Sequence, residues 1–136
     1  MYLILLFLLL VSYGATETTR VRASVHCGFL KKEGLPIVSL MEEDFSSVPI
    51  LNWFDSDDLL DETTVDYGEH FTLDGSEVEM FSTEPYLRIR HKCFTMERED
   101  FVDLANFVED PMGIIHVGHI VLTHQGYKIN PMQLQA

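Results

Sequence analysis

The stretch that most strongly indicates the fold is Glu84-Pro85-Tyr86-Leu87-Arg88-Ile89-Arg90-His91-Lys92-Cys93. Its residues alternate in character: Leu87, Ile89, His91 and Cys93 fall on one side of an extended chain, and Tyr86, Arg88, Arg90 and Lys92 on the other. A period of two is typical of a β-strand with one buried face. The stretch therefore predicts a half-buried strand over residues 85–94 with a basic row on its outer face.

Short alternating runs also occur on both sides of this stretch, separated by turn signals. A first strand carries Val21, Ala23, Val25 and Cys27 on its inward face. Further strands are predicted over residues 35–44, 58–64, 70–73, 78–81 and 114–123, with turns at 28–34, 66–68 and 74–75. No internal repeat or linker interrupts the series. This pattern predicts an all-β protein built as an antiparallel sandwich.

One region, residues 97–109, fits two kinds of element. Phe101, Leu104, Phe107 and Val108 fall at helical spacing, whereas alternation over the same residues is less regular. The local pattern alone slightly favours a short helix.

The first fifteen residues have the features of a secretory signal. An apolar run over residues 1–11 is shorter than the ~20 residues that span a bilayer, and the small residues Ser12, Gly14 and Ala15 follow it. We predict a signal peptide over 1–15 and one domain over 16–136, secreted to the extracellular space. A buried strand or a short anchor is the alternative. The rest of the chain contains no candidate for a membrane span.

The charge balance limits the classes of partner. The chain has 22 acidic and 9 basic residues, and its net charge is −13. Bulk binding to nucleic acid and nonspecific adhesion to anionic membranes are therefore disfavoured. The bases cluster, however, at residues 20–32 and 88–98. A local basic patch could still bind an anion.

The two cysteines, Cys27 and Cys93, end the inward faces of two predicted strands. In an oxidising compartment they could form one disulfide. The alternative is a zinc site, because His91 and Cys93 share a face. No third or fourth ligand can be named for it.

No catalytic motif is present. The chain lacks Gly-x-Ser-x-Gly, a phosphate loop and a dinucleotide fingerprint. An EF-hand counted from Asp55 fails at Leu60, where the loop needs glycine, so the acidic residues 55–62 indicate a solvated turn or a looser calcium site. His116 and His119 have the look of a metal pair but should point to opposite faces of a strand. We expect no catalytic residue, no cofactor and no metal.

Two surfaces are candidate binding sites. The first is the basic row of Arg88, Arg90 and Lys92, because guanidinium groups suit phosphate and carboxylate; the alternative is cross-strand pairing with the many acids. The second is the apolar loop over residues 48–54, which contains Trp53 and Phe54. Exposed apolar patches and tryptophans often mark partner sites. The alternative is that this loop folds back over the end of the sandwich.

These runs together resemble the nematode transthyretin-like family of secreted proteins. The matching segments are residues 21–27, 38–44, 57–64, 71–75, 84–93 and 117–122. The resemblance implies a prealbumin-like, transthyretin-like antiparallel β-sandwich of about seven to eight strands. It also implies strand around residues 101–104, and we adopt that expectation over the local one. The family commonly has four cysteines, whereas this chain has two.

The resemblance implies a secreted, non-enzymatic protein that binds an unknown extracellular protein or an anionic surface, as some relatives bridge or signal at cell surfaces. One alternative is a carrier of a small hydrophobic ligand, since true transthyretins hold thyroid hormone in a tetramer channel. Another is a 5-hydroxyisourate hydrolase. Those enzymes end in Tyr-Arg-Gly-Ser, but residues 130–136 of this chain read NPMQLQA, so the hydrolase alternative lacks its most specific motif.

Overall fold

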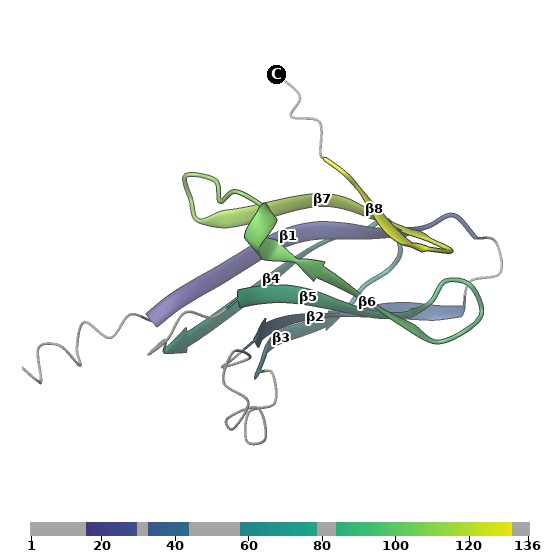
Figure 1. Cartoon of the computed structure of the whole chain (residues 1–136), viewed down its shortest axis with the longest axis horizontal. Helices are drawn as coiled ribbons and strands as arrows, with labels where there is room; N and C mark the ends of the chain where they lie inside the picture. The colour runs from purple at the N-terminus through teal and green to yellow at the C-terminus, as the bar shows by residue number, and fades with distance from the viewer. Residues whose placement is uncertain (1–15, 30–32, 44–57, 79–83, 132–136) are drawn as a thin grey trace, which may run out of the picture.

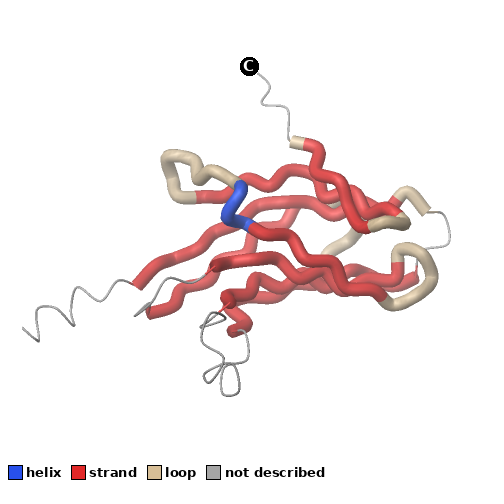
Figure 2. Tube along the Cα trace, viewed as in Figure 1, coloured by secondary structure: helices blue, strands red, loops and turns tan. Residues whose placement is uncertain are grey.

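Eight strands form two four-stranded sheets in the computed structural model, which describes residues 16–29, 33–43, 58–78 and 84–131. They are β1(Thr16–Cys27), β2(Glu33–Glu43), β3(Asp58–Thr64), β4(His70–Val78), β5(Glu84–Lys92), β6(Arg98–Asp103), β7(Ile114–Thr123) and β8(Gly126–Asn130). In Figure 1 β1, β7 and β8 lie above β2, β3 and β5, and Figure 2 shows strand almost throughout the described part. The predicted β-sandwich of about seven to eight strands is confirmed.

The strand order is β4-β1-β7-β8 in the first sheet and β3-β2-β5-β6 in the second. Neighbouring strands run antiparallel, except that β1 and β7 are parallel. β1 and β5 are therefore inner strands, each flanked on both sides. Side chains on their outer faces stand near the middle of the two outer surfaces of the sandwich.

The core lies between the sheets and is built by the alternation that the sequence shows. Leu87 and Ile89 of β5 have no exposed surface, and Val21, Ala23 and Val25 of β1 face them from the first sheet with none either. Each buried Val, Leu or Ile of this kind stabilises the fold by ~1.5–3 kcal/mol relative to an exposed one. The prediction drawn from residues 84–93 is confirmed.

The disulfide joins the two sheets. Cys27, at the end of β1, and Cys93, just after β5, are bonded with their Cα atoms 5.8 Å apart. The bond closes a loop between residues 66 positions apart. The predicted pairing is confirmed, and the zinc alternative loses the Cys93 thiol.

The helix that the local pattern favoured over residues 97–109 is wrong, and the strand that the resemblance implied is confirmed. Residues 98–103 form β6, and only the single turn η1(Leu104–Asn106) follows, with the Asp103 side chain accepting from the Ala105 N–H. Val102 and Leu104 are buried and Phe101 points outward. Pairing with β5 outweighs the weak helical stripe here.

The turn predicted at residues 74–75 is also wrong, because β4 continues through both residues to Val78. Gly75 is required there by packing. A Cβ atom on residue 75 would stand 2.4 Å from the Cβ of Leu60 in β3. The glycine thus lets the edge strands of the two sheets approach closely. The strand β8 was not foreseen either, since its five residues carry little apolar pattern.

We expect Gly75→Ala to lower the free energy of unfolding by about 1–3 kcal/mol, because the new methyl group overlaps a part of Leu60 that cannot rotate away. Urea denaturation followed by circular dichroism measures this loss. Gly28→Ala is the matched control, since a Cβ there meets nothing within 4 Å. Equal midpoints for the two variants would contradict the proposed reason for the glycine.

Several predictions fall outside the described residues: the signal peptide over 1–15, Trp53 and Phe54, and most of the strand at 78–81. Within the described part, no helix has the length and apolar character needed to cross a membrane.

Candidate functional site

The basic row lies on the outer face of β5, near the middle of the second sheet. Arg88 and Arg90 are half-buried and Lys92 is exposed, whereas the intervening Ile89 and His91 point into the core. The sequence therefore placed these three side chains correctly. Their role depends on what stands beside them.

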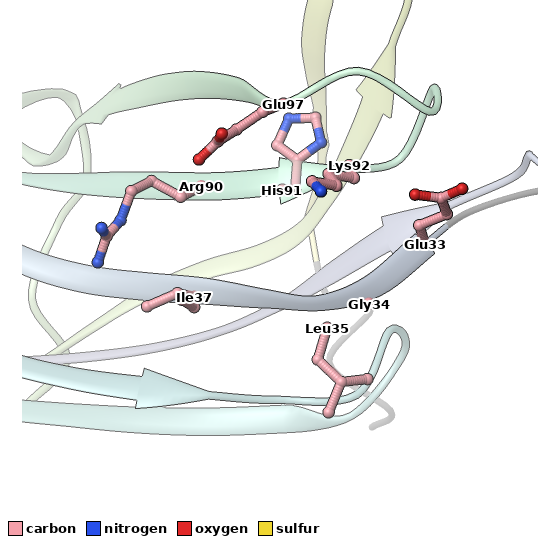
Figure 3. A pocket seen from close by; sticks show the side chains of 8 residues that line it. All are labelled: Glu33, Gly34, Leu35, Ile37, Arg90, His91, Lys92 and Glu97. Carbon is pink, nitrogen blue, oxygen red and sulfur yellow. The ribbon is translucent and has the colours of Figure 1, made fainter.

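Acidic side chains lie beside Arg90 and Lys92, at the C-terminal end of this row. An Arg90 nitrogen is 3.4 Å from a carboxylate oxygen of Glu62, and in register Arg90 stands opposite Glu99 and Lys92 opposite Glu33. Arg90 and Lys92 line an open pocket of about 360 Å³ with residues from β2 and the loop before β6. Figure 3 shows its side chains: Glu33, Leu35, Ile37 and Glu97 beside the two bases. Acids thus balance the bases at this end of the row.

Arg88 has different surroundings. Its register partners are Ser39 in β2 and Phe101 in β6, and it makes no ion pair with any described residue. Phe101 is 52% exposed, and the centroid of its ring lies 6.0 Å from that of the Tyr86 ring. We call Tyr86, Arg88 and Phe101 the Arg88 patch. It joins a guanidinium that forms no ion pair within the described part of the chain to two aromatic rings on one outer surface.

A second cluster, on the outer face of the first sheet, was not foreseen. It comprises Ser24 and His26 of β1, His70 of β4 and His119 of β7, and we call it the histidine cluster. Ser24 Oγ lies 2.9 Å from His26 Nε2 and 2.6 Å from His119 Nδ1, and these two nitrogens are 3.0 Å apart. The rings of His70 and His119 have centroids 5.6 Å apart. Burial, and then the charges of His119 and His70, lower the pKa of His26 below its ordinary value.

A β-bulge in β7 makes this cluster possible. Arg22 pairs with His116 but Ala23 pairs with Gly118, so Val117 is an extra residue in β7. Gly118 has a φ of 90°, which glycine adopts without strain. The bulge brings His116 and His119 to the same face, and the prediction that they point to opposite faces is wrong. His116 is held apart by Asp110, whose Oδ2 lies 2.7 Å from its Nε2.

The glycine in Val117-Gly118-His119 is the one sequence signal for this bulge. An isolated glycine within a strand pattern often marks such a kink. His26 and His70 carry no signal of their own, because the neighbours of β1 depend on the whole topology.

The predicted position of His91 in the core is confirmed. Its Nε2 lies 2.6 Å from Asp100 Oδ2, and its Nδ1 accepts from the Cys93 N–H. Arg98 also donates to Asp100 and to the Gly126 carbonyl oxygen. We call His91, Arg98 and Asp100 the buried polar triad. Every ring nitrogen of His91 is in use, which is the pattern of a structural histidine.

Neither the histidine cluster nor the buried polar triad has the arrangement of a nucleophilic site. Ser24 Oγ is hydrogen-bonded to His26 and His119, and the residue has no exposed surface, so a substrate could not reach its hydroxyl. Among the described residues, no three His, Cys, Asp or Glu side chains already stand where they would all hold one metal ion.

Comparison with known proteins adds one finding. Residues 35–101 match the sequence model of the transthyretin-like family, a span that runs from β2 to β6 and includes the whole basic row. No curated protein matches the chain.

Proposed function

Since this chain belongs to the transthyretin-like family, we propose that it is a secreted, non-enzymatic protein that binds a protein partner outside the cell. The disulfide supports this location, because such bonds form and persist in oxidising compartments. The inaccessible Ser24 hydroxyl and the lack of a catalytic motif support the non-enzymatic part.

The observation that carries the proposal is the Arg88 patch. Arg88 stands on an inner strand without an ion pair to any described residue, beside the exposed ring of Phe101. Arginine and large aromatic side chains are the residues most enriched at binding hot spots. They dock best where the surrounding surface can exclude water, and the middle of a sheet provides such a surface. We place the partner over this patch.

A protein fits this surface better than an anionic membrane does. The bases of β5 have acids near them, namely Glu33, Glu62 and Glu99, and the chain carries a net charge of −13. These acidic side chains would repel an anionic bilayer at distances up to the screening length of ~8 Å. A protein partner can place a single carboxylate on Arg88 and an apolar side chain on Phe101.

We predict that Arg88→Ala weakens binding of the purified, disulfide-bonded protein to cells of the tissue that expresses it by at least about tenfold, the loss typical of one hot-spot residue. Saturation binding of fluorescently labelled protein to intact cells measures the affinity. Trypsin treatment of the cells should remove the binding, because the partner is a protein.

Arg90→Ala is the matched control: it deletes the same side chain from the same face of β5, where Glu62 already neutralises it. It should bind within about twofold of the wild type. Equal losses in the two variants would argue against Arg88 as the anchor. Binding that survives trypsin and is reproduced on phosphatidylserine vesicles would favour the anionic-surface alternative.

A further inference from the structure

The histidine cluster is assembled from three neighbouring strands in one row. His70 of β4 and His119 of β7 are both register partners of Ser24 in β1, on its two sides. His26 follows two residues after Ser24, on the same face of β1. The fold thus brings three imidazoles, far apart in sequence, to one place on the outer surface.

The spacing of the donor atoms has a chemical meaning. Ser24 Oγ, His26 Nε2 and His119 Nδ1 form a triangle with sides of 2.6, 2.9 and 3.0 Å. Two nitrogens bound to one zinc ion at ~2.0–2.1 Å stand ~2.9 Å apart at a right angle and ~3.4 Å apart at the tetrahedral angle. The 3.0 Å between the two ring nitrogens lies within that range.

The cluster is better suited to a metal cation than to protons on both facing ring nitrogens. If both rings carried protons on these nitrogens, two N–H groups would face each other at 3.0 Å. The neutral rings keep at least one lone pair directed at the triangle, which is the form that binds metal.

We propose that His26 and His119 together bind a divalent transition-metal ion of the copper or zinc type, with His70 as the third ligand. Imidazole nitrogen selects such ions over calcium or magnesium, which prefer oxygen. His70 is exposed, and the centroid of its ring lies 5.6 Å from that of His119, so it is a further imidazole beside the triangle. Water completes the coordination.

The role of His70 explains why no complete set of three ligands is already in place among the described residues. The triangle holds two ring nitrogens at ligand spacing. When the ion binds, a ring nitrogen that carries a proton in the triangle passes it to the other nitrogen of its ring by a change of tautomer, and His70 joins as the third ligand. The net charge of −13 favours the approach of a cation to the protein as a whole.

The test uses the untagged, disulfide-bonded protein, titrated with CuCl₂ or ZnCl₂ alone by isothermal calorimetry at neutral pH. One ion should bind per chain. Changing His26 or His119 to glutamine should weaken binding by at least about tenfold, since each removes a direct ligand. His116→Gln is the matched control, because His116 lies on the same face of β7 but is held by Asp110. It should bind as the wild type does.

Electron paramagnetic resonance of the Cu²⁺ complex should show three nitrogen ligands in the wild type and two in His70→Gln. A wild type that binds no more Cu²⁺ or Zn²⁺ than the double variant His26→Gln/His119→Gln overturns the proposal, as does an equal loss in His116→Gln. An unchanged spectrum in His70→Gln removes His70 from the ligand set. Circular dichroism of each variant separates these losses from unfolding.

Discussion

Replacing both Cys27 and Cys93 by alanine should lower the free energy of unfolding by about 4 kcal/mol. The bond joins residues 66 positions apart, so it strongly restricts the unfolded chain. It also joins β1 of one sheet to the end of β5 in the other, and Cys93 is fully buried. For a domain of this size, such a loss is a large part of the whole stability.

Urea denaturation at neutral pH measures this loss as a shift in the midpoint, with the slope checked for a change in the unfolded state. The wild type in reducing agent is the control, since it loses the cross-link and keeps both sulfur atoms. It should lose nearly as much as the double variant. A reduced wild type within about 1 kcal/mol of the oxidised protein would mean that the unfolded chain is already compact around this bond.

The parts of the fold that could be predicted are those with a strong local pattern. Residues 84–93 alternate without a break, and β5 follows that alternation residue by residue. The pairing of Cys27 and Cys93 could be anticipated because only two cysteines exist and both end inward faces. In these cases a short run of sequence contains the physical cause of the structure.

The parts that failed depend on contacts between distant segments. Gly75 resembles a turn residue in sequence, but its reason is Leu60 on the opposite sheet. The helical stripe over 97–109 lost to pairing with β5, which no local pattern reports. Each of these segments is compatible in sequence with two local structures. Contacts with a strand far away in the sequence decide which one forms.

The candidate sites divide in the same way. The basic row was found because its three members lie on one strand, yet the difference between Arg88 and Arg90 arises from Phe101 and Glu62 on other strands. The histidine cluster was missed because its members come from β1, β4 and β7, and because one bulge at Val117 changes which side chains share a face. Single-strand features can be predicted; assembled ones require the topology.

The buried polar triad ties the sheets together at the same end as the disulfide. Asp100 Oδ2 lies 2.6 Å from His91 Nε2 and 3.0 Å from Arg98 Nε. Arg98 extends from β6 of the second sheet to the Gly126 carbonyl oxygen of the first, at 3.0 Å. The β5–β6 loop and the β7–β8 hairpin meet at this end, on the right in Figure 1. Asp100 Oδ2 therefore accepts hydrogen bonds from both His91 and Arg98.

Asp100→Ala should therefore cost about 3 kcal/mol of stability. Breaking a buried pair by removing one partner typically costs ~3–5 kcal/mol, and the lower end applies because Arg98 keeps some access to water. The His91 donor has no such access, since its side chain is fully buried. Glu99→Ala is the matched control: it removes an exposed carboxylate next in sequence and should change stability by no more than about 0.5 kcal/mol.

The size of the loss tests how the triad acts. If Asp100 serves mainly as the acceptor for His91, then Asp100→Asn should recover most of the stability, because its amide oxygen can still accept the Nε2–H. If it serves mainly to neutralise Arg98, Asp100→Asn should resemble Asp100→Ala. We expect partial recovery, since both contacts fall on the single atom Oδ2. Urea midpoints that place Asp100→Ala level with Glu99→Ala would show that the triad does not hold the two sheets together.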